Sequence, residues 1–150
     1  MFFAVKYNIM KYRPKSGGLK MNLDLDYIKS FLIEELEAEL IYLFGSYAVG
    51  KTRDDSDLDL AFLSAKEIDD YQRFLTAQKL ASKLNIDIDL VDLAKASTVF
   101  KTQIIQGDLL FAKNEQQKQQ FELLTLKKYA RLNEERKEII EKIERGAGNG

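Results

Sequence analysis

The sequence contains neither cysteine nor histidine. These absences exclude disulfide bonds, thiol nucleophiles, imidazole bases and the usual zinc sites. Any catalysis must therefore use carboxylates, hydroxyls, lysine, arginine, backbone amides or a hard metal ion. The lack of cysteine also fits a cytoplasmic protein, and we expect that location.

The chain has little net charge and no long apolar run. Its formal net charge is −1, so no overall basic field attracts nucleic acid, and we expect no direct nucleic-acid binding. No apolar stretch is long enough to span a bilayer, and Lys6 interrupts the opening hydrophobic residues. We therefore expect a single globular domain without a membrane contact.

Composition divides the chain into three parts. Residues 1–20 hold the only proline, a Gly-Gly pair and five lysines or arginines, and we expect a flexible N-terminal extension there. Residues 21–145 are expected to form the folded domain. The glycine-rich end, residues 146–150, is expected to be a disordered tail.

Hydrophobic periodicity predicts an α/β domain, in which a small mixed β-sheet is flanked by α-helices and followed by a long C-terminal helix. The predicted helices cover residues 26–40, 69–84, about 98–106 and 114–144. The predicted strands cover residues 41–44, 58–62, 86–93 and 109–111. The residues predicted to face inward include Leu40, Phe74, Leu124, Ile139 and Ile143.

Three polar features accompany the predicted strands. Gly45-Ser46 directly follows the first strand. Ten residues separate Ser46 from Asp57, and Asp59 lies two positions after Asp57. Asp87 and Asp89 repeat this spacing on a later strand. Residues two apart on a strand point to the same face, so each pair places two carboxylates together.

These features have a common chemical interpretation. A Gly-Ser turn presents backbone N–H groups and a hydroxyl to phosphate oxygens. Neighbouring carboxylates repel one another unless a cation lies between them, and magnesium prefers oxygen ligands of this kind. A third carboxylate, from Asp87 or Asp89, would complete a site for two metal ions. The sequence therefore predicts magnesium-dependent chemistry on a phosphate substrate.

The order Gly-Ser, ten residues, Asp-x-Asp resembles the signature of the DNA polymerase beta-like nucleotidyltransferase superfamily. The size of the chain and its long C-terminal helix resemble the minimal branch of that superfamily, and most of all the MntA-type antitoxins of HEPN/MNT toxin–antitoxin systems. The likeness covers residues 41–60, 77–84 and 87–99 most clearly, and roughly residues 21–145 as a whole.

The resemblance implies a nucleotidyltransferase fold and an activity. Members of this branch transfer AMP from ATP to a tyrosine of a partner HEPN ribonuclease toxin, and so neutralise it. The cofactor would be Mg²⁺, with two ions expected, and ATP would be the substrate.

The resemblance also implies roles for individual residues. By position, Gly45 and Ser46 would bind the triphosphate, and Asp57 and Asp59 would hold the metal ions. Asp89 would be the third metal-binding carboxylate and would help to deprotonate the target hydroxyl.

Two further points concern the third carboxylate and the contacts with phosphate. The wording Asp-Leu-Val-Asp-Leu, usual in the family, favours Asp89 over Asp87. Lys51 and Arg53 are additional candidates for contact with phosphate.

Residues 45–52 also satisfy the pattern of a P-loop. A P-loop lysine must be followed by a helix whose N-terminus faces the phosphates. Here a polar stretch and a predicted strand follow at once, so we interpret the match as accidental.

Asp55, Asp57 and Asp59 imitate the first ligands of an EF-hand loop. The glycine required at the sixth position is Leu60, and the glutamate required at the twelfth is Lys66. The flanking pattern is also strand rather than helix, so we reject a calcium site.

Two other functions are alternatives to protein adenylylation. A binding-only antitoxin would inhibit its partner by contact, but three clustered carboxylates are costly to keep without a metal ion. A small-molecule nucleotidyltransferase, such as one acting on aminoglycosides, usually carries an added substrate-binding domain. The single helical region after residue 114 argues against that second alternative.

Overall fold

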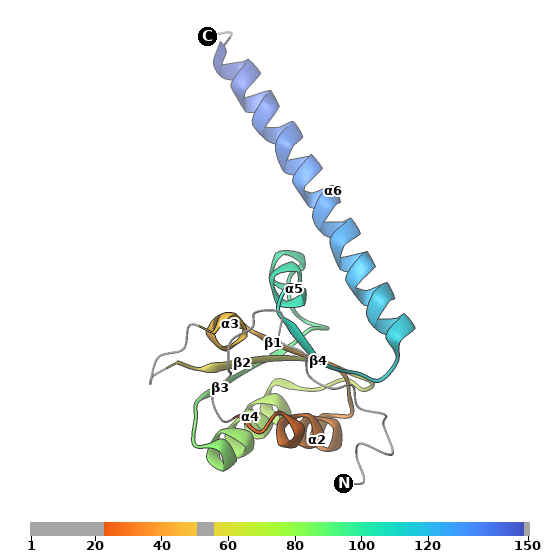
Figure 1. The fold of residues 1–150 in the computed structure, drawn as a ribbon. Helices are drawn as coiled ribbons and strands as arrows, with labels where there is room; N and C mark the ends of the chain where they lie inside the picture. Colours follow the sequence, from red (N-terminus) through yellow and green to blue (C-terminus); the bar gives the residue numbers. More distant parts are fainter. Residues whose placement is uncertain (1–22, 51–55, 149–150) are drawn as a thin grey trace.

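The structure is a computed structural model that describes residues 23–50 and 56–148 (Figure 1). The extension predicted for residues 1–20 lies outside the described residues, as do Lys51 and Arg53. The last helix continues to Gly148, so the domain boundary expected at residue 145 falls inside a helix.

Helices and strands follow one another along the chain in the predicted α/β order. The elements are α2 (Leu25–Leu36), β1 (Ala38–Phe44), α3 (Gly45–Val49), β2 (Leu58–Ser64), α4 (Asp70–Leu84), β3 (Ile88–Asp92), α5 (Thr98–Ile105), β4 (Asp108–Ala112) and α6 (Glu115–Gly148). No helix in the described part of the chain is long and apolar enough to cross a membrane.

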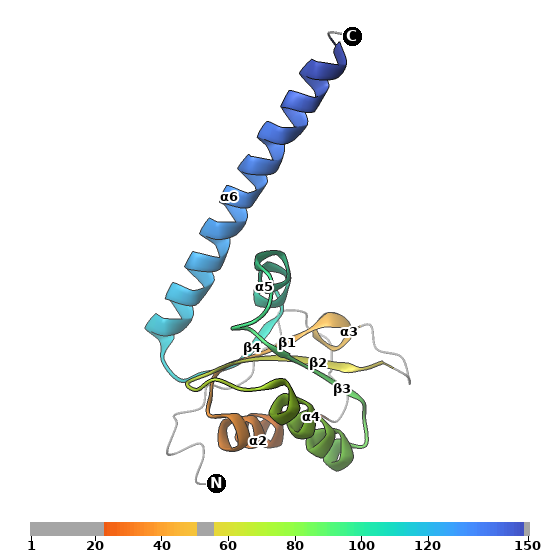
Figure 2. The ribbon, with the colours of Figure 1, turned by 180° about the vertical axis from the view of Figure 1, so that it is seen from behind.

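The four strands form one mixed sheet in the order β3-β2-β1-β4. Strand β1 is antiparallel to both β2 and β4, whereas β2 and β3 are parallel and are connected through α4. Helices α2 and α4 cover one face, and α5 and the start of α6 lie on the other (Figures 1 and 2). This arrangement confirms the predicted mixed sheet with flanking helices.

Helix α2 begins as predicted but ends earlier. The Asp24 side chain caps its start by accepting a hydrogen bond of 3.0 Å from the backbone N–H of Tyr27. Glu37, with a φ of 50°, ends the helix in the left-handed conformation. The prediction that Leu40 belongs to this helix is therefore wrong, because Leu40 lies in β1 and is fully buried in the second core cluster.

Helices α4 and α5 each begin after a residue whose side chain caps the first turn. Asp69 accepts a hydrogen bond from the Gln72 N–H, and Ser97 accepts one from the Phe100 N–H. The inward face of α4 differs from the prediction, because Phe74 is 56% exposed while Ala77 and Leu80 pack into the core. The periodicity of the segment is correct, but its apolar stripe is narrower than predicted.

Helix α6 contacts the body only near its beginning and then projects away from it (Figures 1 and 2). The buried Tyr42 hydroxyl of β1 donates a hydrogen bond of 2.7 Å to Glu122 of α6. The predicted inward positions farther along are wrong, because Leu124, Ile139 and Ile143 are all more than half exposed. Their helical spacing is real, but Ile139 and Ile143 belong to the part of the helix that projects away from the body, and Leu124 lies on an exposed face of its first part.

Candidate active site

The turn between β1 and α3 brings the backbone against a carboxylate. Gly45 opens α3 with a φ of 72°, a conformation that favours glycine. A Cβ atom built on Gly45 would overlap the Oδ2 atom of Asp59. Glycine is therefore needed here for two reasons, and Ser46 follows directly on α3.

The strand register brings two of the predicted carboxylates side by side. Asp57 immediately precedes β2, and Asp59 is the second residue of that strand. Asp59 is aligned with Phe44 at the end of β1 and with Asp89 on the parallel strand β3. Asp59 therefore lies between the Gly45 turn and Asp89.

The three carboxylates interact electrostatically. The pKa of Asp59 is raised from 3.8 to about 6, first by partial burial and then by the negative charges of Asp89 and Asp57. Both causes disfavour the ionised form of Asp59. Asp57, Asp59 and Asp89 therefore form an acidic cluster, in which a cation would relieve the repulsion.

Asp87 occupies a different place from Asp89. Its backbone carbonyl accepts a hydrogen bond of 2.8 Å from the Leu58 N–H, which ties the start of β3 to β2. Its charge is not among those that raise the pKa of Asp59. The register thus brings Asp89, rather than Asp87, opposite the central carboxylate.

The donor chemistry of the acidic cluster fits a hard divalent cation. All three side chains offer carboxylate oxygens, which magnesium prefers over nitrogen or sulfur. Among residues 23–50 and 56–148, no three ligating side chains already stand in a closed metal-binding arrangement.

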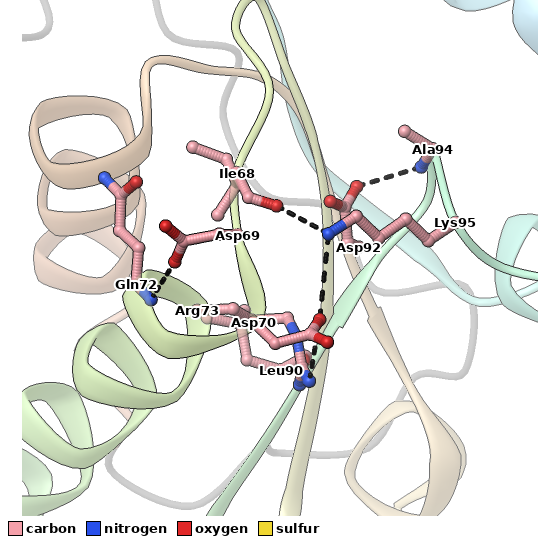
Figure 3. A network of polar contacts seen from close by, with 9 residues as sticks. All are labelled: Ile68, Asp69, Asp70, Gln72, Arg73, Leu90, Asp92, Ala94 and Lys95. Carbon is pink, nitrogen blue, oxygen red and sulfur yellow. Dashed lines mark hydrogen bonds and ion pairs between the residues drawn. The ribbon is translucent and has the colours of Figure 1, made fainter.

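A polar network beside Asp89 carries residues that the sequence did not single out (Figure 3). Arg73 of α4 donates a hydrogen bond of 3.0 Å to the backbone carbonyl of Leu90. Lys95 donates one of 2.7 Å to the Ile68 carbonyl, and Arg73 and Lys95 both lie 3.7 Å from Asp70. The sequence shows only that Asp70 and Arg73 are spaced three residues apart on a predicted helix. This spacing does not indicate the contact of Arg73 with β3.

Two tyrosines near the site are structural. Tyr47 of α3 is 6% exposed and belongs to the first core cluster, and burial raises its pKa. Tyr42 is buried in the second cluster, where burial and the Glu122 carboxylate raise its pKa. Both aromatic side chains therefore serve packing.

Comparisons with known proteins agree with this geometry. The family model described as polymerase beta, nucleotidyltransferase matches residues 26–116. The chain is 44% identical over 106 residues to the protein adenylyltransferase MntA of Shewanella oneidensis, which covers 70% of this chain and 76% of that protein.

Solved structures of toxin–antitoxin complexes share the fold. A complex with AMP-PNP matches with a TM-score of 0.73 and 39% identity, over 81% of this chain and 98% of the other. The complex of a tri-AMPylated Shewanella oneidensis HEPN toxin with its MNT antitoxin matches with a TM-score of 0.66 and 38% identity, over 79% and 94% of the chains. The chain therefore belongs to the polymerase beta nucleotidyltransferase family.

Proposed function

We propose that this protein is an antitoxin that transfers AMP from ATP to a tyrosine hydroxyl of a cognate HEPN ribonuclease toxin and so neutralises it. The observation that carries the proposal is the alignment of Asp59 with Asp89 beside the Gly45 turn. The 44% identity to a protein adenylyltransferase supports transfer to a protein. The similar complexes with AMP-PNP and with a tri-AMPylated HEPN toxin support ATP as the donor and the toxin as the acceptor.

The residues of the site have different roles in the proposed reaction. Gly45 and Ser46 bind the triphosphate, and Asp57, Asp59 and Asp89 hold magnesium, with two ions expected. When bound, the metal ions would neutralise charge on the phosphates. They would also make the acceptor hydroxyl easier to deprotonate.

Three further assignments belong to the same proposal. Asp89, on the outer strand, faces the acceptor and takes the proton of its hydroxyl. Lys51 and Arg53 remain candidates for phosphate contact and lie outside the described residues. The absence of cysteine supports a cytoplasmic location for this reaction.

A binding-only antitoxin is the second candidate, and the exposed residues of α6 are the observation that favours it. Leu123, Leu124 and Leu126 are each about half exposed on a helix that projects from the body. Such a surface suits inhibition by contact. It does not account for the acidic cluster, which contributes repulsion and no packing.

Intact-mass spectrometry of the toxin tests the proposal. After incubation with this protein, ATP and magnesium, the toxin mass should rise by one or more AMP units. EDTA should abolish the increase, as should Asp57→Asn and Asp89→Asn. Asp87→Asn is the matched control, because Asp87 lies two positions before Asp89, just ahead of β3, and its charge does not raise the pKa of Asp59, so it should leave the increase intact.

Two outcomes would change the assignment. An unchanged toxin mass together with tight binding and full inhibition would establish the binding-only antitoxin instead. Loss of transfer in Asp87→Asn with retention in Asp89→Asn would move the third catalytic carboxylate to Asp87.

A further inference from the structure

A groove of about 200 Å³ follows the outer edge of β3 beside the acidic cluster. One wall is formed by residues 89–92 of β3, and the opposite walls come from Asp70 and Arg73 of α4 and from the segment after β3. Asp89 lines this groove and also contributes to the charge that raises the pKa of Asp59. The groove therefore opens directly next to the acidic cluster.

The polar network of Figure 3 fixes the walls of this groove. Arg73 joins α4 to the Leu90 carbonyl, and Lys95 joins the segment after β3 to the Ile68 carbonyl. Both cations also pair with Asp70 in the first turn of α4. Three separate parts of the chain are thus held together around the groove before any partner binds.

The same network determines how a partner can enter. Asp87 accepts a hydrogen bond from β2 through its backbone and Leu93 donates one to β2, so the odd-numbered positions of β3 pair with β2. The Leu90 carbonyl therefore points to the outer edge, where Arg73 already occupies it. An incoming peptide cannot add there as a further strand, so the groove is suited to a single side chain.

The apolar part of the groove suits an aromatic ring. Phe100 and Ala96 line it together with residues 89–92 of β3. Phe100 makes an edge-to-face contact with Phe44, with ring centroids 5.7 Å apart, and remains half-buried. Its ring is therefore held in place and can pack against a second ring.

We propose that this groove receives the side chain of the acceptor tyrosine, with its ring against Phe100 and its hydroxyl at Asp89. The inference rests on the proposed function, because it names where the acceptor of that reaction lies. A serine hydroxyl reaching Asp89 would leave the wall at Phe100 without a contact. The groove thereby selects an aromatic hydroxyl over an aliphatic one.

The reaction at this position balances as a displacement at the α-phosphorus of ATP. The phenolic O–H gives its proton to the Asp89 carboxylate, and the phenolic oxygen forms the new bond to the α-phosphorus. The bond between the α-phosphorus and the oxygen bridging to the β-phosphate breaks, and pyrophosphate leaves with that electron pair. The products are the adenylylated tyrosine and pyrophosphate.

Filling the groove tests the proposal by kinetics. Ala96→Phe should lower kcat/KM for the toxin at least tenfold, while the Kd for AMP-PNP with magnesium stays within twofold of the unmodified protein. Ala94→Phe is the matched control, since Ala94 is exposed two positions earlier and does not line the groove. It should transfer AMP normally, and an Ala96→Phe protein as active as that control would overturn the proposal.

A disulfide-trapping experiment tests the same contact without depending on catalysis. Because the chain has no cysteine, Ala96→Cys and Ala94→Cys each introduce a single thiol. A toxin with its acceptor tyrosine replaced by cysteine should form a disulfide with Ala96→Cys and not with Ala94→Cys.

The two experiments separate the groove from the proposed function. Efficient trapping at position 96 without AMP transfer by the unmodified protein would contradict the proposed function and retain the groove. Normal AMP transfer with trapping at neither position, or at both equally, would overturn the groove assignment alone.

Discussion

The body, formed by the sheet with helices α2–α5, buries its large apolar residues, whereas helix α6 leaves most of its own exposed. In the body, Leu40, Leu58 and Leu60 are completely buried between the sheet and its helices. In α6, which is described along all 34 of its residues, Thr125 is the one that is buried, while Ile139, Ile140 and Ile143 are more than half exposed. The body is therefore stabilised by contacts between distant parts of the chain, and the far half of α6 by its own backbone hydrogen bonds.

The two regions also carry different functional features. The acidic cluster and the groove beside β3 belong entirely to the body, where packing and register fix the side chains. Helix α6 is attached through Tyr42 and Glu122 and through the Lys101 ammonium, which lies 6.0 Å from the centre of the Phe121 ring. The proposed catalytic carboxylates and the exposed apolar residues of α6 thus lie on differently stabilised parts of one chain.

Truncating a buried side chain of the body should change stability more than any other substitution considered. Leu60→Ala should lower the free energy of unfolding by about 2–5 kcal/mol, because it removes a fully buried side chain and leaves a cavity. Ile140→Ala, at a position that is 55% exposed, should change it by less than about 0.5 kcal/mol. Urea denaturation followed by circular dichroism measures both. A large loss for Ile140→Ala would show that the far part of α6 is packed in solution and would contradict its stabilisation by backbone hydrogen bonds alone.

The next effect concerns the turn that faces the acidic cluster. Gly45→Ala should lower AMP transfer by about 100-fold, because its Cβ would displace the Asp59 carboxylate and small displacements at a reacting centre have effects of this size. Gly50→Ala is the matched control, since Gly50 has the same φ of 72° but its added Cβ would meet nothing within 4 Å. Single-turnover rates with saturating ATP separate the two variants. Equal losses in both would assign the effect to backbone strain alone.

A smaller effect is expected where the two regions meet. Tyr42→Phe should lower the free energy of unfolding by about 1–2 kcal/mol, because it leaves the half-buried Glu122 carboxylate without its donor. Amide hydrogen exchange should become faster in the first turns of α6 and stay unchanged in β2. Tyr71→Phe, at a position 71% exposed, is the control and should leave both measurements unaltered.

The smallest effect is a dependence of stability on pH in the metal-free protein. The folded-state pKa of Asp59 is raised from 3.8 to about 6, so the folded chain holds a proton that the unfolded chain has already lost. Stability contributed by this group therefore falls as pH rises through that interval. Asp59→Asn should remove the fall and raise stability at pH 8 by about 1 kcal/mol, a value discounted for solvent screening.

Thermal unfolding from pH 4 to 8 without metal, compared between the original protein and Asp59→Asn, measures this difference. Magnesium should stabilise the original protein more than the variant, because the variant lacks one of the carboxylates proposed to bind it. Parallel pH profiles for the two proteins would exclude Asp59 as the source.

Much of this fold is visible in the sequence because its signals are local. Strand alternation at residues 58–62 and the apolar run at 41–44 indicate β2 and β1, and the caps of α4 and α5, Asp69 and Ser97, are residue types that commonly cap helices. The Gly-Ser turn and the Asp-x-Asp pair are adjacent to these strands in the chain. Their approximate positions therefore follow from periodicity alone.

Other features depend on contacts that no local pattern encodes. Leu40 fits helical spacing from Leu36 as well as it fits a strand, and the left-handed Glu37 that decides between them is not a residue typical of helix ends. The choice between Asp87 and Asp89 depends on the register of β3 against β2. The apolar spacing of α6 predicts a face but contains no information on what covers it.

The parallel pairing of β2 and β3 has a consequence for how the protein matures. Asp59 and Asp89 are 30 positions apart in the chain and meet only after the α4 crossover has closed. Closing such a non-local connection carries an entropic cost that a hairpin does not, so parallel pairing forms slowly compared with local structure. A nascent or partly unfolded chain that lacks this pairing has only two of the three carboxylates of the acidic cluster together, Asp57 and Asp59, so the proposed activity requires completed folding.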